Sequence, residues 1–170
     1  MSHYDYLMGL SNLYQQKNVA YGNSAHQTYC RYGRSSYSLR LSDKFQRLEN
    51  LLSHPEIDVA DESINDTIGD AICYCCMFAA DILCESSIPD FGPNNEANIE
   101  KTISMLQLLA CCNEVEITDM SVVFQDTWDN SHSLTDVIYD MYSDPKTGVL
   151  DYIMLAAHLV CIYNEREREN

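Results

Sequence analysis

A continuous apolar stretch constrains the fold of this chain more than any other feature. Residues 71–79 read Ala-Ile-Cys-Tyr-Cys-Cys-Met-Phe-Ala, inside a helix that we predict over residues 61–85. A helix that is apolar on every side has to be covered on every side, either inside a bundle or at a subunit interface. The sequence therefore predicts an all-α fold with this helix at its centre, and a homodimer as a second way to cover it.

Helical spacing of apolar residues recurs along most of the chain, and Pro55 and Pro145 interrupt it. We expect a bundle of about five to six helices, at residues 3–17, 38–53, 61–85, 96–112, 133–142 and 148–167. The Tyr- and Gly-rich residues 19–36 are expected to form a loop. Residues 113–131 are ambiguous, because residues 115–124 fit either a short strand pair or a helical turn. We divide the chain into a helical core, residues 1–86, and a helical extension, residues 87–170, packed on the same core.

The charge of the chain narrows the choice of partners. The net charge is −16, while 46% of the residues are apolar, too many for a disordered chain. Such an acidic surface repels nucleic acids and anionic membranes, and it suits divalent cations or basic partners. The first residues lack the basic start and apolar run of a signal peptide, and residues 71–83 are too short to cross a bilayer. We therefore expect a cytoplasmic protein that binds neither membranes nor nucleic acids directly.

The eight cysteines indicate reduced thiols. Two adjacent pairs, at residues 75–76 and 111–112, lie within apolar helical patterns, where a disulfide framework would place its cysteines at loop spacings. Cys73 and Cys76 have the spacing of a zinc half-site, but no second pair completes it. Buried thiols that act as small apolar side chains fit the pattern better.

Basic residues are concentrated in one segment. Six of the ten lie within residues 17–47, where the only acidic residue is Asp43. They are Lys17, Arg31, Arg34, Arg40, Lys44 and Arg47. A local cationic cluster on an acidic protein is typical of a site for a small polyanion such as a triphosphate. The alternative is that these side chains pair with neighbouring acids on the surface.

Three carboxylates follow at helical spacing. Glu62, Asp66 and Asp70 are four residues apart, so they lie along one face of the predicted helix over residues 61–85. Like charges at this spacing destabilise a helix unless something neutralises them. Mg²⁺ is one candidate, because it prefers carboxylates, water and phosphate oxygens. The basic residues of the preceding helix are the other candidate to neutralise these carboxylates.

Three blocks of sequence carry a resemblance to a known family. The blocks are Lys17-Asn18-x-x-Tyr21-Gly22-Asn23-Ser24, Arg40-Leu41-x-Asp43-Lys44-x-x-Arg47-Leu48-x-Asn50-Leu51-Leu52 and Asp61-Glu62-Ser63-Ile64-x-Asp66-Thr67-x-x-Asp70. In this order they resemble the phage nucleotide-modification-associated domain family, which is similar to the MazG-like, all-α nucleoside triphosphate pyrophosphohydrolases. The resemblance covers residues 14–83 and implies a MazG-like core with a helical C-terminal extension that has no counterpart.

The resemblance also implies a reaction. A (deoxy)nucleoside triphosphate is cleaved between its α- and β-phosphates with the help of Mg²⁺, in the host cytoplasm if the protein is phage-encoded. Glu62, Asp66 and Asp70 are the implied metal ligands, with Asp43 or Glu49 assisting. Either Glu62 or Asp43 is the implied catalytic group that orients the attacking water.

The same resemblance implies how the nucleotide is held. The implied phosphate-binding residues are Lys17, Arg40, Lys44 and Arg47. Tyr21 and Asn23 are the implied contacts to the base or sugar. Lys44 and Arg47 would stabilise the charge that develops on the leaving pyrophosphate.

Two other functions stay open at the level of sequence. The Glu-Glu-x-x-Glu pair that such enzymes carry on the preceding helix is absent. One alternative function is therefore a protein that sequesters a nucleotide without hydrolysing it. The other alternative is an acidic inhibitor, for example an anti-defence protein that mimics nucleic acid and binds a protein target. The net charge of −16 and the second half of the chain, which has no counterpart in the family, favour it.

Overall fold

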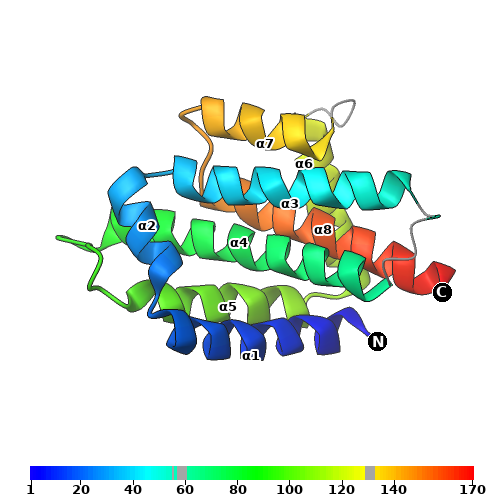
Figure 1. Ribbon diagram of the computed structural model, residues 1–170, viewed down its shortest axis with the longest axis horizontal. Coiled ribbons are helices and arrows are strands. Elements are labelled where there is room, and N and C mark those ends of the chain that lie inside the picture. Colours follow the sequence, from blue (N-terminus) through cyan, green and yellow to red (C-terminus); the bar gives the residue numbers. More distant parts are fainter. Residues whose placement is uncertain (55, 57–60, 129–132) are drawn as a thin grey trace.

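The computed structural model describes residues 1–54, 56, 61–128 and 133–170, with the backbone only at residues 61–63. Within these residues the chain forms eight α-helices and no strand (Figure 1). They are α1 (His3–Tyr21), α2 (Ser24–Tyr32), α3 (Ser35–Ser53), α4 (Asp61–Ser87), α5 (Ala97–Cys111), α6 (Glu114–Trp128), α7 (Leu134–Ser143) and α8 (Val149–Glu169). The predicted all-α class is confirmed, with more helices than the five to six expected.

Helix α4 runs through the centre of the bundle (Figure 1). Helices α8, α3 and α5 pack along it, while α1 packs on α5, α6 on α8 and α7 on α3. The central position predicted for this helix is therefore confirmed. Because helices of the same chain cover α4, no second copy is needed to bury it, and the homodimer stays a prediction without that argument.

A single hydrophobic core joins both halves of the chain. Phe78 of α4 stacks on Tyr152 of α8, with ring centroids 4.1 Å apart, and on Tyr37 of α3 at 5.1 Å. All three side chains are almost completely buried, as is Leu106 of α5. The helices of residues 1–86 and of residues 87–170 thus bury their apolar faces against each other.

Residues 19–36 are not the loop that the sequence predicted. Helix α1 continues to Tyr21, and α2 begins two residues after Gly22 and ends just before Gly33. Gly22 and Gly33 both have positive φ, +62° and +68°, which glycine adopts without strain. The two Tyr-Gly pairs therefore mark two helix ends, and the short helix between them buries part of one face.

Residues 114–128 are helical, so the strand-pair alternative for this region is wrong. Ile117, Ser121 and Phe124 of α6 are buried, and their spacing of four and three residues places them on one face against α8. The rest of that predicted region, residues 129–131, lies outside the described residues.

Helix α4 also passes a membrane-span test that the sequence argument did not foresee. Ile64–Ser87 is long and apolar enough to cross a membrane by length and composition alone, with a mean hydropathy of 1.6. The helix extends on both sides of the apolar run at residues 71–83, from Asp61 to Ser87. In the structure 67% of this window is buried within the protein, and the core helix of a bundle passes the same test.

The cysteines are all unpaired, as expected. Cys75, Cys76 and Cys84 are buried in the core, while Cys111 is exposed at the end of α5. Burial raises the pKa of Cys75 and of Cys76, so both thiols stay protonated and neutral.

Candidate functional site

A cavity of about 230 Å³ opens between α1, α3 and α4, with the start of α2 at its edge. We call it the α1–α3–α4 cavity. Its polar wall carries Lys17, Tyr21, Arg40, Asp70 and Tyr74. Its apolar wall includes Leu10, Leu13, Cys73 and Met77. The cavity therefore brings together, from three helices, four of the residues predicted for nucleotide and metal binding: Lys17, Tyr21, Arg40 and Asp70.

Asp70 lies between two lysines. Lys44 Nζ is 2.9 Å from Asp70 Oδ2, and Lys17 Nζ is 3.7 Å from Asp70 Oδ1. The lysines come from α3 and α1, so the carboxylate ties both helices to α4. The expected meeting of the basic segment with the acidic helix is observed for these residues, with a cavity beside the ion pairs.

Arg40 is held over an aromatic ring. Its guanidinium carbon is 5.7 Å from the centroid of the Tyr74 ring, a cation–π distance. Among the described residues Arg40 makes no hydrogen bond or ion pair. Its N–H groups are thus free to bind an anion that enters the cavity.

The cavity wall contributes no second negative charge. Burial and the charge of Asp70 together raise the pKa of the Cys73 thiol to about 12. Cys73 is therefore neutral. The polar wall then carries two cations and one anion, with Lys44 as a further cation on the far side of Asp70.

The predicted metal set does not form around Asp70. Both of its oxygens face lysine ammonium groups, and Asp66, one turn earlier, is exposed. In the part of the chain that the structure describes, no three His, Cys, Asp or Glu side chains could hold one metal ion. The side chain of Glu62 lies outside the described residues. The Mg²⁺ site and the catalytic role of Glu62 stay predictions.

The remaining predicted residues lie away from the cavity wall. Asp43 and Arg47 are exposed on α3, and neither lines the cavity. Asn23 is only 8% exposed, and its side-chain amide exchanges two hydrogen bonds with Asn98 of α5, of 3.2 and 3.0 Å. Its hydrogen-bonding groups are therefore used to fix the start of α2 against α5.

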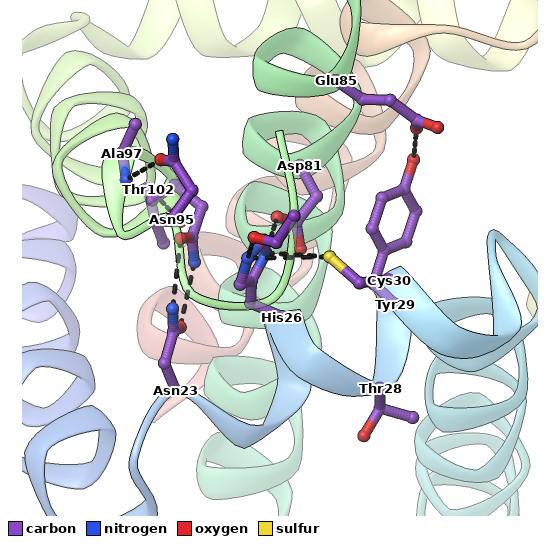
Figure 2. Close-up of polar contacts among 12 residues, drawn as sticks. Asn23, His26, Thr28, Tyr29, Cys30, Asp81, Glu85, Asn95, Ala97 and Thr102 are labelled. Carbon is purple, nitrogen blue, oxygen red and sulfur yellow. Dashed lines mark hydrogen bonds and ion pairs between the residues drawn. The ribbon is translucent and has the colours of Figure 1, made fainter. Parts of the chain in front are cut away.

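A second polar cluster lies between α2 and α4, and sequence reasoning missed it (Figure 2). His26 is fully buried, with Nδ1 2.6 Å from Asp81 Oδ1 and Nε2 2.9 Å from the carbonyl oxygen of Gly92. Tyr37 donates its hydroxyl to Asp81 Oδ2 at 2.5 Å. The ring thus faces an acceptor at each nitrogen, which is the arrangement that a doubly protonated imidazolium satisfies.

The pKa of His26 follows from this geometry. Burial alone would lower it, but the hydrogen bonds to Asp81 and Gly92 and the charge of Asp81 outweigh burial, and the pKa is raised. Cys30 Sγ lies 3.7 Å from His26 Nε2. Because both ring nitrogens are engaged, His26 is not placed to take a proton from Cys30. Burial and the charges of Asp81 and Glu85 raise the pKa of that thiol, so the pair is not a nucleophile and its base.

One signal for this cluster was present in the sequence. Asp81 is the only charged residue within residues 71–84, and a charge inside a buried helix requires a partner. Its partner His26 is 55 residues away, in the segment that was expected to be a loop. Without the fold, nothing connects the two.

No protein-family model matches this chain, and no curated protein or solved structure matches it either. The resemblance to the phage nucleotide-modification-associated domain family therefore stays a prediction. Function has to be inferred from the geometry of the two polar regions.

Proposed function

We propose that this protein binds a nucleotide in the α1–α3–α4 cavity. The observation that carries the proposal is Arg40, whose guanidinium lies over the Tyr74 ring in the cavity wall and has no hydrogen-bond or ion-pair partner among the described residues. A guanidinium fixed in this way is suited to a phosphate, because its planar fork makes two parallel hydrogen bonds to phosphate oxygens.

Lys17 supplies a second contact to the phosphate. Its ion pair with Asp70 is the longer of the two, 3.7 Å against 2.9 Å for Lys44, and its side chain is 49% exposed. An exposed ion pair of this length contributes little stability. Lys17 can therefore turn to an incoming phosphate while Lys44 keeps Asp70 neutralised.

The aromatic and apolar residues suit the rest of a nucleotide. Tyr74 lies in the cavity and Tyr21, which is 67% exposed, stands at its edge. The volume of about 230 Å³ is below the range of pockets that enclose a whole drug-sized ligand. The phosphate and sugar therefore fill the cavity, and the base lies over the exposed Tyr21 ring.

The proposal is one of binding, without a metal. Among the described residues no three His, Cys, Asp or Glu side chains are grouped to hold a metal ion, and both oxygens of Asp70 face lysines. Hydrolysis of a triphosphate, which the family resemblance implies, is a separate outcome to be measured.

Calorimetric titration tests the proposal. The protein is titrated with nucleoside mono- and triphosphates in EDTA, and then with Mg²⁺ while pyrophosphate release is followed. We expect binding in EDTA and a loss of about tenfold or more in affinity for Arg40→Gln, because a hydrogen bond to a charged group contributes about 1.5–3 kcal/mol. Lys17→Gln is expected to weaken binding as well.

Lys146→Gln is the matched control. It removes the same charge from an exposed position between α7 and α8 that does not line the cavity. Its affinity should equal that of the unaltered protein. Failure of every nucleotide to bind at about 1 mM, the weak end of specific affinities, would contradict the proposal, as would an Arg40→Gln variant with full affinity. Release of pyrophosphate in Mg²⁺ would add the hydrolase activity to it.

A further inference from the structure

A second cavity, of about 320 Å³, lies at the other end of α2, between that helix, the end of α4 and residues 91–93. We call it the Arg34–Glu85 cavity after the two charged residues in its wall. Phe91 and Pro93 give it an apolar side. None of its lining residues lines the α1–α3–α4 cavity, so it is a separate feature.

The two charges in this cavity are held apart. The guanidinium of Arg34 donates to the backbone carbonyl of Thr147, at the loop before α8. Glu85, near the end of α4, accepts a hydrogen bond through Oε2 from the hydroxyl of Tyr29 (Figure 2). No ion pair joins Arg34 to Glu85, although both line one cavity. Each charge is thus anchored by a different element and is not neutralised by the other.

Both groups retain free hydrogen-bonding capacity. The guanidinium has five N–H groups, and the structure gives one of them a partner among the described residues. Glu85 keeps its second carboxylate oxygen, since the Tyr29 bond uses only Oε2. A cation and an anion that face one cavity with unused donors and acceptors match a ligand that carries both charges.

Side-chain contacts hold the loop that forms one wall of this cavity. The Gly92 carbonyl is fixed by His26 Nε2 at 2.9 Å, and the His26 ring packs at a tilt on Phe91, with centroids 4.9 Å apart. The Asn95 side chain caps the start of α5 by accepting from the backbone N–H of Ala97 at 2.9 Å, so the loop is held at that end too (Figure 2). A site that is already ordered loses less entropy when it binds a ligand.

We infer that the Arg34–Glu85 cavity binds a small zwitterion of the free amino acid class, with its carboxylate on Arg34 and its ammonium on Glu85. Arginine binds a carboxylate through two parallel hydrogen bonds, and a carboxylate is the natural partner of an ammonium group. Phe91 and Pro93 favour a ligand with an apolar side chain. This inference does not rest on the proposed nucleotide binding.

Calorimetric titration of the full chain with defined probes tests the inference. The probes are L-leucine and L-phenylalanine, then β-alanine and 4-aminobutyrate, whose charges are farther apart, and then isovalerate and isobutylamine, which carry one charge each. We expect at least one of the zwitterions to bind, and each singly charged analogue to bind about tenfold or more weakly. The distance between ammonium and carboxylate in the zwitterion that binds most tightly indicates how far apart Arg34 and Glu85 hold the two groups.

Two charge-removing variants locate the ligand. Glu85→Gln keeps an acceptor for the Tyr29 hydroxyl, and Arg34→Gln keeps a donor for the Thr147 carbonyl, so each removes a charge with little loss of structure. Each is expected to weaken zwitterion binding about tenfold or more. Glu100→Gln, on exposed α5 surface, is the control and should bind normally.

Two results would overturn the inference. One is the failure of every zwitterion to bind the unaltered protein at about 1 mM. The other is a Glu85→Gln variant with unchanged affinity, which would place the ligand elsewhere. Unfolding temperatures and nucleotide titrations of the same variants establish that they fold, because neither residue lines the α1–α3–α4 cavity.

Discussion

At the scale of single residues, the buried pair of His26 and Asp81 is the most unusual feature of this protein. Both side chains are fully buried and face each other (Figure 2). Tyr37 donates to the second Asp81 oxygen, and the Gly92 carbonyl lies at the second His26 nitrogen. Removing one member of such a pair leaves an uncompensated charge, which costs about 3–5 kcal/mol. The pair links α2 to the central helix and to the loop that follows it.

The raised pKa of His26 makes its contribution to stability depend on pH. A histidine whose pKa is higher in the folded state than in the unfolded state stabilises the fold fully below the unfolded value of about 6.5. This stabilisation is lost as the pH rises through the raised folded value. We expect His26→Gln to lower the free energy of unfolding by about 3 kcal/mol at about pH 6, and by less at about pH 9.

Urea denaturation at the two pH values measures this difference. The control is His54→Gln, at an exposed position paired with Glu56 on the surface, which should change stability little at either pH. If His26→Gln lowered the free energy of unfolding equally at both pH values, the charge of the His26 ring would not be what stabilises the fold.

The sequence predicted which charged residues come together better than it predicted which side chain each of them contacts. Lys17, Arg40 and Asp70 do share a cavity wall, because their spacing placed them on facing helices. The pairing of Lys44 with Asp70 is the alternative that the sequence offered for these carboxylates. The pairing of Asn23 with Asn98 depends instead on the distance between helices and on side-chain rotamers. Sequence spacing does not contain that information.

At the scale of helices, Gly69 sets how closely α1 approaches α4. A Cβ atom at this position would lie 2.8 Å from Leu10 Cδ2 and 2.9 Å from the Tyr6 hydroxyl. Tyr6 has little freedom to move, because it donates to the Asn65 carbonyl at 2.7 Å and stacks on Tyr163 with centroids 3.8 Å apart. The glycine therefore permits the contact that also brings Lys17 to Asp70.

We expect Gly69→Ala to destabilise the protein. Alanine gains about 1 kcal/mol of helix propensity over glycine, but overpacking against a fixed neighbour costs about 1–3 kcal/mol. The net loss should be largest when Tyr6 is retained, and Gly69→Ala with Tyr6→Phe should recover part of it. Thermal unfolding of the three proteins measures the effect.

Gly9→Ala is the matched control for that comparison. Gly9 lies within α1, and a Cβ atom there meets nothing within 4 Å. The substitution should raise stability by about 1 kcal/mol through helix propensity alone. If Gly69→Ala were stabilised by as much as Gly9→Ala, α1 would not be in close contact with α4 at this point.

Helix periodicity predicted six of the eight helices because their apolar faces are long enough to show it. Helix α2 was missed because it has nine residues and few apolar side chains, and because its flanking glycines suggested a loop. Its buried face consists of Ala25, His26 and Tyr29, so polar contacts rather than apolar periodicity hold it. Helix α6 was ambiguous because valines at residues 122 and 123 favour strands, and tertiary packing on α8 overrode that preference.

At the scale of the whole molecule, residues 1–86 and residues 87–170 contribute to one hydrophobic core. The central helix contributes Phe78, which stacks on Tyr152 of α8, and α5 covers another side. A fragment of residues 1–87 would expose the parts of α4 that α5 and α8 cover. Such a fragment lacks the partners that bury its hydrophobic face.

We therefore expect residues 1–87, expressed alone, not to form a cooperatively folded protein. Proton NMR should show poor dispersion, and thermal unfolding should lack a sharp transition. Expression together with residues 88–170 should restore both signals. A well-dispersed spectrum from residues 1–87 alone would show that the first half is an independent domain.

Helix α2 has a further consequence for the two cavities. Ser24 and Ala25 form part of the wall of one, and Tyr29 and Cys30 form part of the wall of the other. Because this one short helix contributes to both walls, a ligand in one cavity that shifted α2 would also change the wall of the other. By thermodynamic linkage, the factor by which a ligand in one cavity changed the affinity of the other would equal the factor in the reverse direction.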